Sequence, residues 1–205
     1  MITSQLLRTY PIISDQVDVK ELRIVLSELE WLLQRGGQGA VVEFGCYVGT
    51  TSLFITRLLS QYNSSSSYHV FDSFSGLPNK THQDYSAAGE QFKAGELLAT
   101  KKQFIANFKK AGLTPPVIHK GWFADINSTD VPGDIMFAFL DGDYYESIKD
   151  SFRLITSKLV KGAVIIVDDY VSSALPGAAK ATDEWAGQQN CHLKVEASLA
   201  IMRLQ

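Results

Sequence analysis

Two aspartate clusters follow apolar runs that are typical of buried parallel strands. Asp141 and Asp143 stand in LDGDYYES, and Asp168 and Asp169 stand in VIIVDDY, 27 residues further on. Carboxylates at the carboxyl ends of neighbouring parallel strands converge on one crevice. Oxygen ligands of this kind suit Mg²⁺, which keeps waters that a substrate hydroxyl can displace. The two clusters therefore predict a site where a divalent cation and a hydroxyl compound meet.

A glycine-containing turn in VVEFGCYVGTTS joins an apolar run to a helical pattern. Its first glycine lets the backbone turn sharply off the strand, and its second lets a ligand approach the backbone closely. The helix that follows begins with free amides, which favour a carboxylate. The spacing ExGxxxG differs from the GxGxxG of dinucleotide sites, which must seat a pyrophosphate. S-adenosylmethionine carries only a carboxylate, a ribose and an adenine. The cofactor-binding candidates in this turn are Glu43, Gly45, Tyr47, Gly49 and Thr51.

Two further segments could complete a cofactor site. Asp72 ends the apolar run of YHVFDS, followed by Ser73, and its carboxylate could accept hydrogen bonds from both ribose hydroxyls. The alternative is that Asp72 caps a turn in DSFSGLP. Gly121 and Trp122 follow another apolar run and could place an aromatic face beside the adenine, although a tryptophan there could equally belong to the core.

Alternating strands and helices must position these residues. The apolar runs predict strands at 41–45, 68–73, 116–121, 135–141 and 163–168, with helices at 50–60, 99–111, 145–159 and 177–187. Five such repeats predict an α/β fold with a doubly wound, Rossmann-like, mostly parallel sheet. The tail LKVEASLAIMRL predicts an antiparallel C-terminal hairpin at the sheet edge.

The chain length of 205 residues favours one domain over residues 1–205. Residues 1–38 form an N-terminal helical segment in which Asp18 and Glu21 predict a capping box. Ile24 and Trp31 form a second apolar stripe that could face the core, a lid or another subunit of a homo-oligomer. Residues 79–98, the longest irregular insertion, predict a lid over the substrate.

Composition excludes several classes of protein. No apolar run approaches the ~20 residues that span a bilayer, and no export signal is apparent, so we expect no membrane association and a cytoplasmic location. A net charge of −3 with scattered basic residues disfavours a nucleic-acid substrate. Two cysteines are too few for a disulfide framework or a zinc site.

Six motifs, in order, carry a family resemblance: EFGCYVG, FDSFSGLP, KGWFADI, FLDGDYYESI, GAVIIVDDY and PGAAKATDEW. Over roughly residues 40 to 187 the chain resembles the macrocin O-methyltransferase family, and more distantly catechol O-methyltransferase. The resemblance implies a class I methyltransferase sheet, S-adenosylmethionine, Mg²⁺ and methylation of hydroxyls on sugars and natural products.

The resemblance also implies roles for the aspartates. The family's metal ligands fall on Asp141, Asp168 and Asp169, and Asp141 becomes the candidate general base, with Asp143 supporting the following helix or the cofactor side. A carboxylate bound to a cation is a weak base, so His82 or His119 could serve instead. The lysine that catechol-type enzymes carry after the first metal aspartate is missing here, where the sequence reads Tyr144-Tyr145.

The predicted function is methyl transfer from S-adenosylmethionine to a hydroxyl of a sugar or other small natural product, assisted by Mg²⁺. A catechol-like or phenolic acceptor is the nearest alternative. A nucleic-acid or protein methyltransferase would need a basic groove and no metal. A non-catalytic cofactor-binding module would have no use for the acidic residues.

Overall fold

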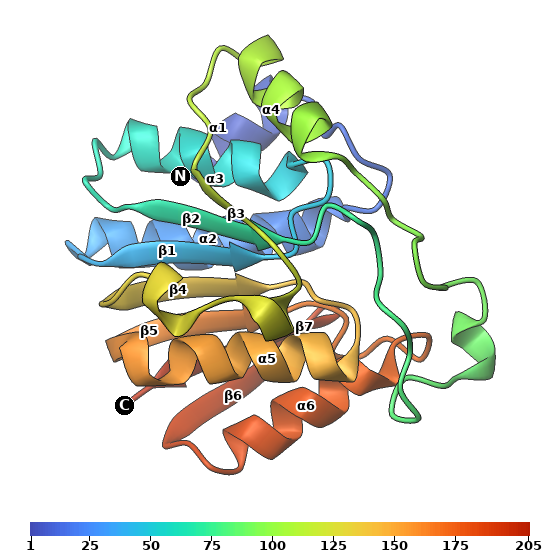
Figure 1. Cartoon of the computed structure of the whole chain (residues 1–205). Helices are drawn as coiled ribbons and strands as arrows, with labels where there is room; N and C mark the ends of the chain where they lie inside the picture. The colour runs from blue at the N-terminus through green and yellow to red at the C-terminus, as the bar shows by residue number, and fades with distance from the viewer.

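A seven-stranded sheet organises the computed structural model, which describes all 205 residues (Figure 1). The strand order is β3-β2-β1-β4-β5-β7-β6. Strands β1 to β5 are parallel, while β7 runs antiparallel to both β5 and β6. The strands are β1 Ala40–Phe44, β2 Tyr68–Asp72, β3 Val117–Lys120, β4 Ile135–Leu140, β5 Leu159–Val167, β6 Cys191–Glu196 and β7 Leu199–Leu204.

Helices cover both faces of the sheet and give it two separate cores (Figure 1). One core holds side chains of α2, α3 and α4, and the other holds those of α5 and α6. The central strands are apolar on both sides because both faces are covered; every residue of β4 is buried. The helices are α1 Ile2–Thr9, α2 Val19–Gln34, α3 Thr50–Gln61, α4 Lys101–Lys110, α5 Tyr145–Ile155 and α6 Pro176–Ala186.

The predicted α/β fold, with its mostly parallel sheet and antiparallel C-terminal strand, is confirmed. The C-terminal hairpin lies at the sheet edge as predicted; within it β7 pairs with β5, so β6 is the outermost strand. The helix predicted over 145–159 is too long. It ends at Ile155, a short 3₁₀ turn over Thr156–Lys158 follows, and β5 begins at Leu159, four residues before the predicted start. Gly162, at a φ of +79°, lies within this early part of the strand.

The N-terminal segment contains two helices, α1 and α2. Asp18 caps α2 as predicted and accepts hydrogen bonds from the amides of Lys20 and Glu21. The second half of the predicted capping box is wrong, because the Glu21 carboxylate accepts a hydrogen bond from Ser198 instead. Ile24 and Trp31 pack, partly buried, against the core. None of the helices is long and apolar enough to cross a membrane.

The carboxyl ends of the parallel strands lie at one edge of the sheet, where the long connections gather. The residues between β2 and α4, green in Figure 1, run outside this edge and reach the start of α6. They contain one short 3₁₀ turn, Ala87–Gly89. The segment predicted as a lid therefore lies at the edge that carries the aspartates.

Candidate active site

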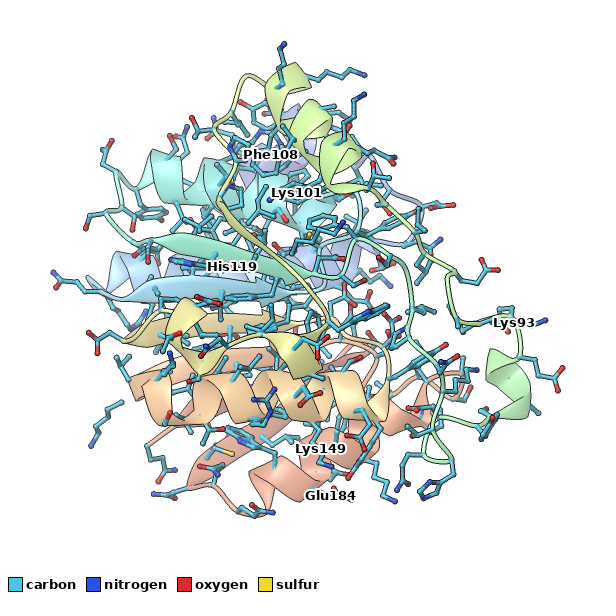
Figure 2. All side chains as sticks on the ribbon, in the orientation of Figure 1. Lys93, Lys101, Phe108, His119, Lys149 and Glu184 are labelled. Carbon is cyan, nitrogen blue, oxygen red and sulfur yellow. The ribbon has the colours of Figure 1, made fainter.

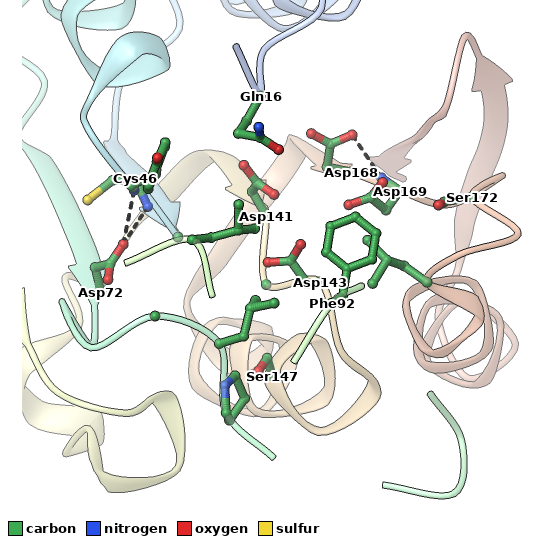
Figure 3. Close-up of a pocket in the computed structure, with 18 of the residues that line it drawn as sticks. Gln16, Cys46, Asp72, Phe92, Asp141, Asp143, Ser147, Asp168, Asp169 and Ser172 are labelled. Carbon is green, nitrogen blue, oxygen red and sulfur yellow. Dashed lines mark hydrogen bonds between the residues drawn. The ribbon is translucent and has the colours of Figure 1, made fainter. Parts of the chain in front are cut away.

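A cavity of about 390 Å³ opens at the carboxyl edge of the sheet (Figure 3). Its lining comes from the glycine turn after β1, the end of β2, the insertion before α4, and the loops that follow β4 and β5. Gln16 and Glu21 join it from the N-terminal segment. Segments far apart in the chain thus meet at one hollow, as parallel-sheet topology requires.

Three carboxylates lie close enough together to share a cation. One oxygen each of Asp141, Asp143 and Asp169 lies within 4.8 Å of the other two, and Figure 3 shows the three side chains facing one another. No protein group donates a hydrogen bond to any of these three carboxylates. Asp168 lines the same cavity, but its Oδ1 accepts from the Asp169 amide at 2.8 Å and from Ser198 Oγ at 3.3 Å.

The close set therefore overlaps only partly with the set implied by the resemblance. Asp141 and Asp169 belong to both sets, whereas Asp143 takes the place given to Asp168. Asp143 and Asp169 both have positive φ values, 59° and 57°. This left-handed conformation is uncommon outside glycine but tolerated by aspartate, and here it occurs in the turns that leave β4 and β5.

Burial and mutual repulsion raise the pKa of every aspartate in the cluster. Burial raises the pKa of Asp143 to about 7, and Asp168 adds to the effect. Burial and then the charge of Asp168 raise the pKa of Asp169 to about 8. The pKa of Asp168 rises to about 6 through burial, and that of Asp141 rises well above its usual range. Such a cluster favours a cation, which relieves both causes at once.

No lysine, arginine or histidine lines the cavity. Six acidic residues do: Glu21, Asp72, Asp141, Asp143, Asp168 and Asp169. A sulfonium together with a divalent cation would bring three positive charges to this site. The charge of the lining therefore suits both groups predicted from the sequence.

The glycine turn and Asp72 form one hydrogen-bonded unit. Asp72 Oδ2 accepts from the amides of Cys46 and Tyr47 at 2.8 and 3.1 Å, and its Oδ1 accepts from the Phe74 amide at 2.7 Å. A carboxylate offers about four acceptor positions, so roughly one remains for a ribose hydroxyl. At Gly45, with a φ of +86°, a Cβ would lie 1.9 Å from the Asp141 carbonyl oxygen. Only glycine lets the turn approach the loop after β4 this closely.

The sequence-predicted site residues divide into two groups. Those that line the cavity are Gly45, Tyr47, Asp72, Ser73, Trp122, Asp141, Asp168 and Asp169. Those outside the lining are Glu43, Gly49, Thr51 and Gly121. Gly49 takes a left-handed conformation at the start of α3, where a Cβ would meet the Phe104 ring at 2.8 Å.

Glu43 lies beneath the site rather than in it. Its side chain is 1% exposed and accepts hydrogen bonds from Ser52 Oγ, at 2.6 Å, and from the Tyr68 hydroxyl. Burial raises its pKa to about 7. Glu43 thus connects β1 to α3 and β2 beneath the glycine turn.

The two histidines considered as bases do not line the cavity. His119 Nε2 lies 3.0 Å from His69 Nδ1, and its ring stacks on Phe71. Figure 2 shows His119 on the strands, well away from the insertion that carries Lys93. His82 lies exposed in the insertion. Apart from Cys46 and Tyr47, the titratable side chains that line the cavity are therefore carboxylates.

Sequence reasoning missed several lining residues. Gln16 and Ser198 come from connections with no recognisable motif, and the sequence assigns Glu21 of α2 only to the capping box. The apolar wall is built by Leu77, Phe92, Leu97, Val171 and Leu175. An interpretation of residues 79–98 as a lid identified the segment but not which of its side chains face inward.

Known O-methyltransferases match most of this chain. The model of the macrocin O-methyltransferase (TylF) family matches residues 17–198. The chain is 30% identical, over 165 residues, to the 8-demethyl-8-(2,3-dimethoxy-alpha-L-rhamnosyl)-tetracenomycin-C 4'-O-methyltransferase of Streptomyces olivaceus, a match that covers 77% of this chain and 63% of that protein. It is 26% identical to the demethyldecarbamoylnovobiocin O-methyltransferase of Streptomyces niveus, over 82% of this chain and 66% of that protein. The matches thus span less than two thirds of the length of these relatives.

Solved structures show the same fold. The O-methyltransferase NovP superposes with a TM-score of 0.81 at 23% identity, covering 92% of this chain and 81% of that one. The calicheamicin methyltransferase CalS11 gives a TM-score of 0.75 at 19% identity, covering 98% and 90%. With the family model matching most of its residues, the chain belongs to the macrocin O-methyltransferase family.

Proposed function

We propose that this chain is an S-adenosylmethionine-dependent and Mg²⁺-dependent O-methyltransferase whose acceptor is a hydroxyl of a sugar or other small natural product. The observation that carries the proposal is the cavity in which the glycine turn meets three close carboxylates without protein donors. Family membership and relatives named as O-methyltransferases of glycosylated or aromatic natural products support it.

The cofactor would occupy the side of the cavity formed by the glycine turn. The remaining acceptor position of Asp72, beside the glycine turn, suits a ribose hydroxyl. Trp122, 39% exposed at the cavity, offers an aromatic face for the adenine. In this arrangement the sulfonium faces the acidic cluster.

The carboxylates would hold Mg²⁺, with Asp141 and Asp169 as ligands in either set and Asp168 or Asp143 completing it. When bound there, Mg²⁺ supplies a positive charge that lowers the pKa of a neighbouring acceptor hydroxyl. The methyl group then passes from sulfur to the hydroxyl oxygen, the S–CH₃ bond breaks, and S-adenosylhomocysteine leaves.

The proton of the acceptor hydroxyl passes to a carboxylate in the same cluster. Asp141 is our proposed base, because it belongs to the carboxylate cluster and its backbone lies against the glycine turn. Asp143 is the second candidate, since burial raises its pKa to about 7, close to the range that general bases use. Replacement by asparagine, assayed at saturating Mg²⁺, separates the two: replacing the base should lower turnover by more than the accompanying loss of cation affinity explains.

The test is methyl transfer from labelled S-adenosylmethionine to a panel of neutral glycosides and catechols, with Mg²⁺ and with EDTA. We expect transfer only with Mg²⁺, and loss of at least about a hundredfold in kcat/KM for Asp169→Asn. Asp125→Asn, a change on an exposed side chain outside the cavity, is the matched control. Undiminished turnover in EDTA would contradict the metal role, and transfer to catechols alone would favour the phenolic alternative. A cytoplasmic location and a homo-oligomeric state stay predictions.

A further inference from the structure

Asp84 is a buried carboxylate in the insertion, and the mechanism proposed above does not use it. Only 1% of its surface is exposed. Its Oδ2 accepts from the amide and the hydroxyl of Thr81, both at 2.8 Å, and its Oδ1 accepts from the amide of Tyr145 at 2.7 Å. Tyr145 is the first residue of α5, so Asp84 caps a helix that lies 61 residues further along the chain.

A second helix start approaches the same carboxylate. Gly177 lies in the first turn of α6, and a Cβ there would be 1.9 Å from Asp84 Oδ1 and 2.7 Å from the Tyr145 nitrogen. The carboxylate thus lies where the amino ends of α5 and α6 converge. No basic side chain pairs with it, and the partial positive charge of both helix ends lies beside it.

Other contacts hold the insertion against the loops that precede α5 and α6. The Tyr144 hydroxyl donates to the Phe92 carbonyl at 3.1 Å, and Ser86 Oγ donates to the Ser173 carbonyl at 2.5 Å. At Gly89, a Cβ would lie 2.1 Å from the Ala174 carbonyl oxygen. The insertion is therefore packed on the segments that directly follow the DGD and DD motifs.

The position of α5 bears on the reaction because the loop before it is short. Only residues 141–144 separate β4 from α5, and they include Asp141 and Asp143. Asp143 keeps a left-handed backbone conformation there. The start of α5 therefore sets where both carboxylates point.

We infer that Asp84 is a positioning residue: it fixes the insertion as a wall of the acceptor site and, through the start of α5, sets the geometry of Asp141 and Asp143. This inference rests on the proposed function for its relevance to catalysis. It also revises the predicted lid, since a segment with these buried contacts is a docked wall. Phe92 and Leu97 are the side chains that this wall presents to the cavity.

Two variants test the contact from its two sides. Asp84→Asn keeps the shape but removes the charge and one acceptor. Gly177→Ala improves helix propensity, yet its methyl group would displace the carboxylate. Thr100→Ala is the matched control, because Thr100 caps α4 by accepting from the Gln103 amide, away from the cavity.

The measurements are hydrogen–deuterium exchange of the full chain and Mn²⁺ binding followed by electron paramagnetic resonance, with Mn²⁺ as the probe for the cation site. In both test variants we expect faster exchange at 79–98 and at 145–149 together, and Mn²⁺ affinity weaker by about tenfold. A methylation assay should show kcat/KM lower by about 10- to 100-fold, since a misplacement of about 1 Å can cost that much. Thr100→Ala should change none of these.

Unchanged exchange at 79–98 in both variants would overturn the inference. Faster exchange confined to 79–98, with wild-type Mn²⁺ affinity, would also overturn it, because Asp84 would then anchor the insertion without positioning the carboxylates. A wild-type chain that binds no Mn²⁺ would contradict the proposed function instead, while exchange at the two segments still decides the role of Asp84.

Discussion

Replacing Glu43 by glutamine tests the structural role assigned to this buried carboxyl group. Glu43 is 1% exposed and its two hydrogen-bond partners, Ser52 and Tyr68, are hydroxyl groups. Burial raises its pKa from 4.5 to about 7. Glutamine has nearly the same shape and cannot ionise, so the exchange isolates the free energy of carrying a charge at this position.

The sign and size follow from proton linkage. In the folded chain Glu43 keeps its proton up to about pH 7, whereas in the unfolded chain it loses it near pH 4.5. The folded state binds more protons between these values, so its stability falls as the pH rises through this window. At 1.36 kcal/mol per pKa unit, Glu43 makes the chain about 2.5 kcal/mol less stable at pH 8 than at pH 5.

The assay is urea unfolding of wild type and Glu43→Gln in EDTA at both pH values. The amide group of the new glutamine lowers the free energy of unfolding by about 1 to 3 kcal/mol, because its N–H donors lack partners. This cost is the same at both pH values. It therefore cancels when the change in unfolding free energy between pH 5 and pH 8 is compared between the two proteins. We expect the variant to lose about 2.5 kcal/mol less between pH 5 and pH 8. Glu90→Gln, on an exposed side chain, should match wild type. Equal pH dependence of wild type and Glu43→Gln would refute the reasoning.

Three further predictions concern ligands. Mg²⁺ at a hundred times its dissociation constant should raise the free energy of unfolding, measured with urea, by about 2.7 kcal/mol. At a fixed Mg²⁺ concentration this stabilisation should be larger at pH 8 than at pH 5, because carboxylates must lose their protons to bind the ion. Trp122→Ala should weaken S-adenosylhomocysteine by about 1 to 3 kcal/mol in calorimetry, as loss of a base stacked on an aromatic ring typically does. A sugar presented as a nucleoside diphosphate should have a kcat/KM at least about tenfold below that of the same sugar in a neutral glycoside. The reason is that its negative charges would meet six carboxylates and no basic residue in the cavity lining. Similar kcat/KM values for the two substrates would contradict this charge argument.

Much of the fold could be predicted because its signals are local. The apolar runs of β1, β2 and β4 are continuous and end at polar residues, which identifies buried parallel strands to within one or two residues. The start of β5 was placed four residues late because Gly162 interrupts its pattern. The place of β7 between β5 and β6 was not predictable, since strand order in a hairpin depends on which neighbour is available in space.

The sequence predicted which strand ends contribute aspartates to the site, but not which of these aspartates lie closest together. Strand-end position alone brought Asp141 and Asp169 together correctly, because parallel strands fix where their carboxyl ends lie. It could not distinguish Asp143 from Asp168, since that choice depends on backbone turns at positive φ and on a hydrogen bond from Ser198, 30 residues away from Asp168. Asp84 carries no sequence signal at all, because its partner amide is defined only by the tertiary fold.

The hydrogen-bond partners of the acids at this edge separate structural roles from chemical ones. Asp72 and Asp84 accept from backbone amides, and Glu43 accepts from buried hydroxyls, so each already has the partners that folding can supply. Asp141, Asp143 and Asp169 have no protein donor, although the sheet brings them within 4.8 Å of one another. Folding therefore leaves electrostatic repulsion in the cluster that only a proton or a cation can relieve. We expect the repulsion that destabilises the metal-free chain at high pH to be the source of the proposed cation affinity, so replacing any one of the three by asparagine should change stability and metal binding together.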